Sequence, residues 1–550
     1  MAESYADRSA QMFPRLSPEQ IARLASQGRR RQVGRGEIVV EQGAASPDFF
    51  VVISGEVEIV EPRDGEERRL ILLTHGQFTG EISLVAGRRN LLRIRACMDG
   101  ELLAIPPDAL RRIVQTDADL SELFVRAFLL RRAALISAGQ GDTVLVGSIH
   151  SAATLRVREF LSRNGQPYAY VDVDVDPAAQ ELLDRFGVRA GDIPVLICRS
   201  ERVLKNPSNE EIAECLGFNR ELDPAAVRDV VVVGAGPAGL AAAVYGASEG
   251  LDVLVLEGNA PGGQAGSSSR IENYLGFPTG ISGQALAARA YTQAEKFGAE
   301  IAIARPAARL DCEHRPYAVE LSDGSSVKAR AIVIATGVQY RKPDCAECAR
   351  FEGVGVYYAA TPIEAQLCRG HDVAIVGGGN SAGQAAVFLA SHARSVRVLV
   401  RGAGLSETMS RYLISRIEET PNVTVHAYHQ IVGVDGERHL ERVQVRDGRS
   451  GDTRTLPVRH LFMMTGADPN TRWLQGCVAL DDKGFVRTGG DLRPGDLSAW
   501  PLSRAPHALE TSAPGVFAVG DVRAGSMKRV ASAVGEGSAC IQLVHRVLAE

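Results

Sequence analysis

The sequence predicts a multidomain protein with an N-terminal β-sandwich or jelly roll, a small α/β domain, and two larger three-layer α/β domains. Three observations predict this organisation. At 550 residues, the chain is too long for a single core of ordinary size. Short segments that alternate apolar and polar residues fill the first part, whereas strand-like and helix-like segments alternate after about residue 142. Two glycine-rich loops, each between an apolar strand and a helix, mark the last two domains.

Composition narrows the class of protein. The net charge of -5 and the 23% of charged residues are typical of a soluble globular protein and favour neither nucleic acid nor an anionic membrane as a partner. The N-terminal residues MAESYADRSAQMFPRL lack a basic and apolar leader, so we expect a cytoplasmic protein. The nine cysteines are mostly scattered, which predicts reduced thiols and no metal site.

The first segment, residues 1–140, reads as short strands followed by a helix from Pro107 to about Leu135. Through SGEVEIV (54–60) and FTGEISLVAG (78–87) it resembles the cyclic nucleotide-binding domain. The resemblance implies that Glu81 takes the ribose hydroxyl and that an Arg nine residues later takes the phosphate, but that position holds Asn90. Asn cannot meet two phosphate oxygens as an Arg fork does.

Two interpretations of this first domain remain open. Three nearby arginines could replace the missing one, namely Arg88, Arg89 and Arg93. Cyclic nucleotide binding therefore stays an alternative, and we favour a docking or dimerisation module, since a fold does not bring its ligand with it.

The second segment, 141–220, alternates strands and helices in the order β-α-β-α-β-β-α. It resembles a glutaredoxin or thioredoxin-like domain, in which a C-x-x-C follows the first strand; the matching positions here are Ser151 and Thr154. Pro194 matches the cis-proline of that fold. Hydroxyl groups cannot exchange with a disulfide. We therefore expect a thioredoxin-like domain without redox activity, serving as a contact surface.

A dinucleotide-binding motif begins at Arg228. A strand leads into GAGPAG, whose six residues are Gly234, Ala235, Gly236, Pro237, Ala238 and Gly239, and an acid, Glu257, ends the next strand. The first Gly allows the tight turn, the second lets the backbone approach a pyrophosphate, and the third lets helix and strand pack closely. The acid is placed to accept hydrogen bonds from a ribose. This pattern predicts a Rossmann-like dinucleotide-binding domain.

A second copy of the motif starts at Asp372. Gly377, Gly379 and Ala382 occupy the fingerprint positions, with Asn380 and Ser381 between them. The following strand ends near Arg401 and without a carboxylate, so Arg401 could meet a 2′-phosphate. The pattern favours NADPH, with NADH as the alternative. Arg401 could also be a surface arginine that binds no ligand.

Five further motifs make the chain from Arg228 onward resemble the thioredoxin reductase family: PGGQ (261–264), IENYLGFP (271–278), ATG (335–337), MTGADPNT (464–471) and GVFAVGDV (515–522). The resemblance implies FAD and NADPH as cofactors and a homodimer. It implies that the following residues contact FAD: Gly263, Gln264, Asn273, Ala335, Thr336, Gly337, Gly520, Asp521, Lys528, Arg529 and Val530.

The resemblance also implies the domain order. The FAD domain would comprise 228–340 and 465–550, with an NAD(P)H domain, 341–464, inserted into it and hinges near Gln339 and Gly466. In the family, rotation about such hinges places the nicotinamide on the flavin in one pose and exposes a dithiol to the protein substrate in the other.

The sequence differs from the family at the positions of the redox-active dithiol. Aligned on GVYYAATP (355–362), its cysteine positions fall on Ala359 and Pro362. A C-x-x-C at Cys345 and Cys348 is the candidate catalytic pair in its place. We therefore predict an NAD(P)H-dependent flavoprotein that passes electrons to a protein disulfide or a small-molecule acceptor. The alternatives are a ferredoxin- or flavodoxin-NADP reductase-like enzyme and a flavin-bound, ligand-regulated sensor or scaffold.

Overall fold

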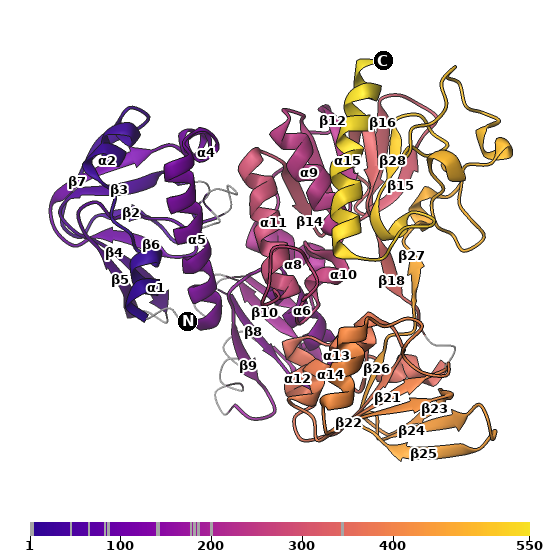
Figure 1. Ribbon diagram of the computed structural model, residues 1–550. Helices are drawn as coiled ribbons and strands as arrows, with labels where there is room; N and C mark the ends of the chain where they lie inside the picture. Colours follow the sequence, from indigo (N-terminus) through magenta and orange to yellow (C-terminus); the bar gives the residue numbers. More distant parts are fainter. Residues whose placement is uncertain are drawn as a thin grey trace. The chain divides into compact units, whose positions relative to one another are not determined.

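The computed structural model describes residues 5–44, 47–63, 66–81, 84, 89–138, 143–176, 179, 183, 188–198, 202–342 and 346–550 (Figure 1). These residues form two compact units. One comprises Met1–Ser148, Phe160–Glu221 and Thr292–Ile303, and the other comprises Ile149–Glu159, Leu222–Tyr291 and Ala304–Glu550.

As far as its residues are described, the N-terminal part of the first unit contains two antiparallel sheets and four helices. One sheet has the order β1 (Arg29–Val33), β7 (Gly100–Ile105), β3 (Phe49–Ser54); the other has β2 (Ile38–Val40), β6 (Arg93–Ala96), β4 (Val57–Arg63), β5 (Glu66–Leu73). The helices are α1 (Tyr5–Met12), α2 (Pro18–Ala25), α4 (Pro107–Thr116) and α5 (Ala118–Ala138). The β-rich segment followed by helices thus agrees with the sequence-based expectation.

The helical segment of this part differs from the expectation in one respect. The single helix expected from Pro107 to about Leu135 is two helices, because Asp117 has an extended backbone and its carboxylate accepts the Leu120 N–H at the start of α5. Four phenylalanines fill the core between the first sheet and these helices, with ring centroids 5.0–6.2 Å apart: Phe49, Phe78, Phe124 and Phe128.

The next segment contains a four-stranded mixed sheet in the order β11-β10-β8-β9. Its elements are β8 (Thr143–Gly147), α6 (Ala152–Arg163), β9 (Ala169–Asp172), β10 (Val195–Cys198), β11 (Arg202–Lys205) and α8 (Asn209–Leu216). Strands β8 and β9 are parallel, and β10 is antiparallel to β8 and β11. The Ile193–Pro194 peptide bond is cis, as expected. The helix expected over 177–188 lies mostly outside the described residues.

The second unit contains two large sheets. The first has the strand order β13 (Val253–Glu257), β12 (Val227–Val233), β17 (Ser326–Ile334), β16 (Tyr317–Leu321), β15 (Ala307–Asp311), and β28 (Val516–Ala518) pairs with β17. Strand β12 runs parallel to β13 and β17, and its last four valines, Val230 to Val233, are buried. Helices α9 (Pro237–Ser248) and α15 (Val530–Ala549) run side by side on this sheet (Figure 1).

The second large sheet is wholly parallel. Its order is β19 (Val356–Tyr357), β26 (His460–Met463), β20 (Asp372–Val376), β21 (Ser395–Val400), β22 (Val423–Ala427). Helices α12 (Pro362–Leu367), α13 (Asn380–Ala390) and α14 (Arg411–Glu419) accompany it, as does a small sheet of β23 (His429–Asp435), β24 (Arg442–Asp447) and β25 (Thr453–Pro457). The parallel strands of each large sheet, with their helices, have the predicted Rossmann-type arrangement.

The chain passes between these two sheets twice, and the two crossings pair with each other. Strand β18 (Val338–Tyr340) lies antiparallel to β27 (Ala467–Pro469), with Gln339 opposite Asp468. Glycines with positive φ adjoin both strands, Gly337 at +61° and Gly466 at +98°. The predicted hinge positions therefore fall in one short two-stranded ribbon.

The remaining elements are short or lie between the larger ones. They are α10 (Gly263–Gly266), α11 (Gly283–Phe297), β14 (Glu300–Ile303), η1 (Ala190–Asp192), η2 (Ala346–Phe351), η3 (Arg472–Leu474), η4 (Gly489–Asp491), η5 (Pro494–Leu497) and η6 (Gly520–Val522). No helix in the described ranges has the length and apolar character that a bilayer crossing requires. The expectation of reduced thiols is wrong for Cys312 and Cys477, which form a disulfide.

Candidate functional site

The first glycine loop packs so tightly that only glycine fits at two of its positions. A Cβ on Gly239 would lie 1.8 Å from the carbonyl oxygen of Gly234, and a Cβ on Gly234 would lie 2.4 Å from that of Ala335. Gly236 is different, because the nearest atom to its Cβ position is 4.0 Å away. The backbone at Gly236, where α9 begins, is therefore open to a ligand, and the helix N-terminus beside it favours an anion.

Three other segments meet this loop. A Cβ on Gly263 would lie 3.1 Å from the Cα of Gly236, and a Cβ on Gly520 would lie 2.9 Å from the Cβ of Ala238. Gln264 donates to the carbonyl oxygen of Val338, next to the ATG motif. The structure thus brings the predicted residues of GAGPAG, PGGQ, ATG and GVFAVGD together at the N-terminus of α9.

Glu257 uses both carboxylate oxygens to hold the loop. One oxygen accepts the Ala235 N–H at 2.8 Å and the other accepts the Asn259 N–H at 2.8 Å. These bonds fix the acid at the end of β13, beside the glycine turn. A ribose hydroxyl would therefore meet a carboxylate that is already positioned.

Asp521 lies in η6, next to Gly520. Burial raises the pKa of its carboxyl group, and the positive charge of Lys528 opposes this shift. The Lys528 ammonium donates to the Asp521 carbonyl oxygen at 3.0 Å, and partial burial lowers the pKa of Lys528. Arg529 precedes α15, and Val530 is its first residue. Asn273, by contrast, is exposed to solvent.

The sequence reasoning missed two residues behind this loop, Glu536 and Gly537 of α15. Glu536 accepts the Gly520 N–H at 2.7 Å and pairs with Arg523 at 2.6 Å. A Cβ on Gly537 would lie 2.1 Å from the carbonyl oxygen of Ala238, so α15 approaches α9 closely at this point. The available signal was a glycine in a helix interior, where glycine is unfavourable unless close packing requires it.

The second glycine loop repeats this arrangement on the parallel sheet. A Cβ on Gly377 would lie 2.4 Å from the carbonyl oxygen of Met464, and Ala382 is fully buried. No described atom lies within 4 Å of the Cβ position of Gly379, which precedes α13. Asn380 holds the neighbouring loop by accepting the Ser410 N–H at 2.8 Å. Arg401 follows β21 directly and is exposed.

Tyr340 interacts with one residue of each site, through a hydrogen bond in one case and electrostatically in the other. Ser381 of the second loop is hydrogen-bonded to Tyr340 of the hinge strand β18, and Asp521 is close enough to act on the same hydroxyl. Burial is the main reason that the pKa of Tyr340 is raised. The sequence analysis did not single out Tyr340.

Two adjacent loops of this kind, one on each Rossmann-type sheet, bind dinucleotides in many proteins. The family model for pyridine nucleotide-disulphide oxidoreductase matches residues 228–537. The chain belongs to this family. A model of the cyclic nucleotide-binding domain also matches residues 30–117. This oxidoreductase is accordingly an NAD(P)H-dependent flavoprotein with a cyclic nucleotide-binding domain near its N-terminus.

Curated relatives and solved structures that resemble this chain include thioredoxin reductases. A thioredoxin reductase of Streptomyces clavuligerus is 32% identical over 324 residues, which are 59% of this chain and 94% of the relative. The thioredoxin reductase structure from Lactococcus lactis has 26% identity, covers 58% of this chain and 99% of its own, and gives a TM-score of 0.53. The thioredoxin reductase structure from T. acidophilum has 26% identity, covers 59% of this chain and 99% of its own, and also gives a TM-score of 0.53. The oxidoreductase is thus thioredoxin reductase-like over its second half.

In this oxidoreductase, the stretch predicted to correspond to the family's dithiol is packed into the parallel-sheet domain. Pro362 is the first residue of α12, and Thr361 caps the helix with Glu364 in a capping box. Tyr357 is buried at 7% exposure, stacks at 5.9 Å on His460 and lies 5.1 Å from Phe462. Tyr358 donates to Glu352 at 2.9 Å. Both tyrosines are therefore held within this domain by their own neighbours.

The candidate dithiol is only partly described. Cys345 lies outside the described residues, and Cys348 is buried at 1% exposure in a cluster with Phe351, Val356 and Leu440. A thiol buried to this degree reaches an external disulfide only if η2 moves. Redox activity of Cys345 and Cys348 stays a prediction.

The buried side chain of His460, which stacks on Tyr357, should make the stability of the protein depend on pH. Burial holds the pKa of His460 down at about 4, and the neighbouring His371 adds to this effect. Because the unfolded chain binds a proton near pH 6.5 and the folded one does not, His460 should lower the free energy of unfolding between pH 6.5 and 4, by about 3 kcal/mol in all. Above pH 6.5 its contribution is complete.

The measurement is chemical denaturation at several pH values. The free energy of unfolding of His460→Asn should fall less steeply between pH 6.5 and 4 than that of the unmutated protein. Identical slopes would show that His460 is protonated in the folded state. His314, whose side chain is 78% exposed, provides the surface control as His314→Asn.

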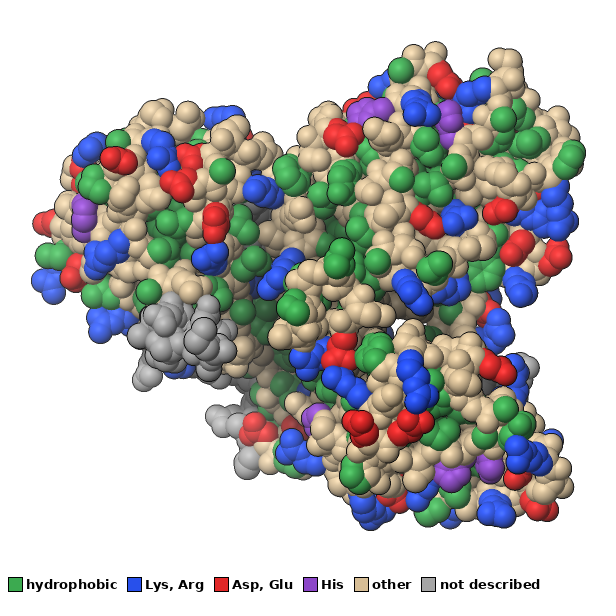
Figure 2. All heavy atoms as spheres, in the orientation of Figure 1, with side chains coloured by type: hydrophobic (Ala, Val, Ile, Leu, Met, Phe, Trp, Pro, Cys, Tyr) green, Lys and Arg blue, Asp and Glu red, His purple; other side chains and the backbone are tan. Residues whose placement is uncertain are grey.

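The residues predicted from the cyclic nucleotide-binding resemblance are largely engaged elsewhere. Glu81 is paired with Arg132 at 3.3 Å, and Asn90 donates to the carbonyl oxygen of Leu92. Arg93 is paired with Glu41 and Glu67, whereas Arg88 lies outside the described residues. On the face shown in Figure 2, basic and acidic side chains are interspersed over the surface.

Proposed function

We propose that this oxidoreductase binds FAD at the first glycine loop and NADPH at the second, and delivers electrons to a disulfide or another acceptor without the family's usual dithiol. The observation that supports this most directly is the convergence of GAGPAG, PGGQ, ATG and GVFAVGD at the N-terminus of α9. Four motifs far apart in the sequence surround one open glycine, Gly236. This arrangement favours a bound dinucleotide over a purely structural role.

The residues at the first site fit FAD. The open backbone at Gly236 and the start of α9 would receive the pyrophosphate, and Glu257 would accept ribose hydroxyls. Asp521 would hold the ribityl chain, with Lys528 beside it as a positive charge. Bound FAD would supply the chemistry, accepting hydride from the nicotinamide. The protein contributes position and charge.

The residues at the second site fit a nicotinamide dinucleotide. Gly379 leaves space at the start of α13, as Gly236 does at α9. The strand β21 ends without a carboxylate, and the exposed Arg401 stands there instead. Arg401 would pair with a 2′-phosphate, which favours NADPH over NADH.

Replacing Arg401 should therefore separate the two nucleotides. Arg401→Ala is expected to raise the KM for NADPH about 10- to 100-fold, because a hydrogen bond to a charged group contributes roughly 1.5–3 kcal/mol. The KM for NADH should stay the same, since NADH has no 2′-phosphate. Steady-state kinetics with both nucleotides measure this. Arg454→Ala, an exposed arginine on β25, is the matched control. Equal changes for NADPH and NADH would contradict the assignment.

The ribbon of β18 and β27 is the proposed axis of domain rotation. Its two strands contain both chain crossings, and Gly337 and Gly466 can absorb changes in backbone angle. The hydrogen bond between Tyr340 and Ser381 would form or break during such a rotation. Rotation would alternately present the nicotinamide and the acceptor to the flavin.

Electrons would leave the flavin by a route that differs from the family's usual one. Ala359 and Pro362 have no redox chemistry, so electrons would leave through Cys345 and Cys348 or pass directly to the acceptor. A ferredoxin- or flavodoxin-NADP reductase-like activity is the second candidate, and the same two residues favour it. The N-terminal domain and a thioredoxin-like domain without C-x-x-C would dock the acceptor or modulate rotation, in a homodimer.

Anaerobic reduction of the purified protein tests the proposal. NADPH should bleach the flavin absorbance, and candidate acceptors, an oxidised thioredoxin and an oxidised ferredoxin among them, should restore it. If neither NADPH nor NADH bleaches the flavin, the proposal fails. If the flavin is bleached and Cys348→Ser leaves reoxidation unchanged, direct transfer replaces the Cys345 and Cys348 route. Deletion of residues 1–220 that leaves reoxidation unchanged would exclude acceptor docking by the N-terminal segments.

A further inference from the structure

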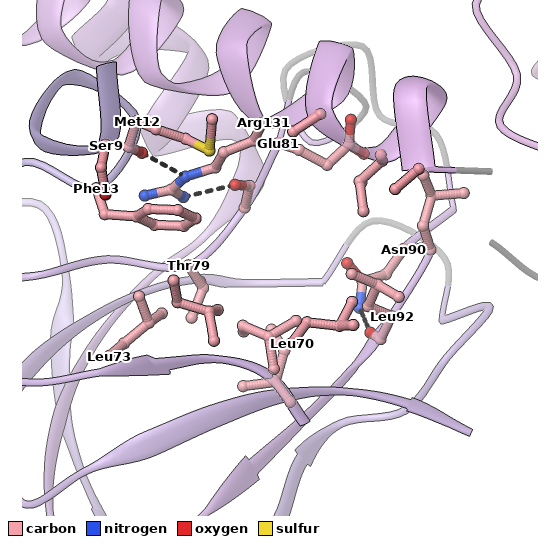
Figure 3. Close-up of a pocket in the computed structure, with 18 of the residues that line it drawn as sticks. Ser9, Met12, Phe13, Leu70, Leu73, Thr79, Glu81, Asn90, Leu92 and Arg131 are labelled. Carbon is pink, nitrogen blue, oxygen red and sulfur yellow. Dashed lines mark hydrogen bonds between the residues drawn. The ribbon is translucent and has the colours of Figure 1, made fainter. Parts of the chain in front are cut away.

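The N-terminal sandwich contains a cavity of about 670 Å³, within the range that small-molecule sites occupy (Figure 3). Strands β4 and β5 form one wall and helices α1 and α5 the opposite one. Most of the lining is apolar, including Phe13, Ile59, Leu70, Leu73, Leu92 and Leu135. An apolar ligand surface would be stabilised here by burial.

Among the described residues that line this cavity, Arg131 of α5 is the basic one and Glu81 the acidic one. The Arg131 side chain is buried, with the residue at 7% exposure, and it donates from Nε to the Met12 carbonyl oxygen at 2.9 Å and from Nη1 to that of Gly80 at 2.7 Å. The guanidinium also lies against the rings of Phe13 and Phe78, at 4.9 and 4.7 Å from their centroids. These contacts fix the position of the charge.

The third guanidinium nitrogen, Nη2, is buried and finds no hydrogen-bond acceptor among the described residues. A buried donor without a partner is unfavourable, and more so when the group is charged. Burial lowers the pKa of Arg131 to about 9, and the negative charge of Glu81 opposes this shift, so Arg131 stays protonated at pH 7. An anionic group from a ligand would satisfy this donor and neutralise the charge.

The arrangement does not suit a cyclic nucleotide. The carboxylate assigned to the ribose, Glu81, is paired with Arg132, and Asn90 stands at the phosphate position and bonds to its own backbone neighbour. A ribose and a base would bring several polar groups against leucine side chains, where they would lose hydrogen bonds to water. A molecule with one anionic group and an apolar body matches the lining better.

We propose that this cavity binds a monocarboxylic acid with an aliphatic chain, with the carboxylate at Arg131 and the chain against the leucines of β5 and α5. A planar carboxylate can accept two N–H donors of a guanidinium, which a hydroxyl or an amide cannot match. The site lies within the N-terminal sandwich. It is independent of the proposed nucleotide sites.

Calorimetric titration of the full-length protein tests the site, with decanoate as the probe and decanamide as its uncharged analogue. Decanoate should bind at least tenfold more tightly than decanamide. Arg131→Met should weaken decanoate binding at least tenfold and leave decanamide binding unchanged. Arg126→Met is the matched control on the same helix, because Arg126 is 55% exposed and pairs with Glu122. It should bind decanoate like the unmutated protein.

A second variant keeps the test decisive if Arg131→Met does not fold. Ala134→Trp fills the cavity beside Arg131 without removing the charge, and it should abolish binding of both probes. The proposal is overturned if the unmutated protein does not bind decanoate. It is also overturned if Arg131→Met or Ala134→Trp folds and binds decanoate as tightly as the unmutated protein does. Tighter binding of cyclic AMP or cyclic GMP than of decanoate, in competition, would overturn the ligand class.

Discussion

Gly537→Ala is expected to release the flavin and destabilise the protein. The added methyl group would lie 2.1 Å from the carbonyl oxygen of Ala238 and 3.0 Å from the Cβ of Ala241, and backbone atoms cannot move aside as a flexible side chain can. Helix α15 would have to withdraw from α9, at a cost of about 1–3 kcal/mol or more. Ala238 belongs to the loop that we propose binds FAD, so the purified variant should lack most of its flavin absorbance.

The same helix provides the control. No described atom lies within 4 Å of the Cβ position of Gly535, two residues earlier in α15. Gly535→Ala should keep the flavin and gain about 0.5–1 kcal/mol, because alanine favours a helix more than glycine does. The measurements are the ratio of visible to protein absorbance and the free energy of unfolding. Full flavin content in Gly537→Ala would show that the approach of α15 to α9 is not needed for binding.

Gly379→Ala is expected to weaken NADPH binding about 10- to 100-fold without loss of stability. Its backbone has φ of −91°, which alanine adopts freely, and the Cβ position is open. The methyl group would occupy the space through which a pyrophosphate approaches α13. Flavin content and the free energy of unfolding should equal those of the unmutated protein. Rapid-mixing reduction of the flavin at increasing NADPH concentrations measures the affinity.

Two other glycines separate a ligand effect from a folding effect. Gly377→Ala would place its Cβ 2.4 Å from the carbonyl oxygen of Met464, so that variant should lose stability as well as NADPH affinity. Gly490→Ala, another open glycine in the second unit, should change neither. If the flavin of Gly379→Ala is reduced at the same NADPH concentrations as that of the unmutated protein, the second loop does not bind the nucleotide.

Local sequence patterns predicted much of the site. The spacing of Gly234, Gly236 and Gly239 reflects contacts within a single turn, and the structure shows close contacts at the first and third positions and open space at the second. Glu257 could be placed because one helix and one strand, α9 and β13, follow the loop and β13 ends at this residue. Such short-range relations are readable because the backbone geometry of one β-α-β unit determines them.

Long-range relations were not readable in this way. Gly537 and Ala238 lie about 300 residues apart, and only the packing of α15 on α9 shows why a helix there contains glycine. Arg131 is one of two adjacent arginines in an apolar helix, and periodicity alone does not distinguish the one that enters the cavity from the one that pairs with Glu81. The direction of these side chains depends on neighbouring elements.

The sequence by itself determined the family, the two nucleotide loops and the absence of cysteine at Ala359 and Pro362, because these features are local in the chain. Only the tertiary structure decided that Tyr357 is packed against His460 and Phe462, that Cys348 is buried, and that Glu81 is already paired. Burial and pairing depend on which distant segments meet. Those meetings result from the packing of whole sheets and helices, which no short motif specifies.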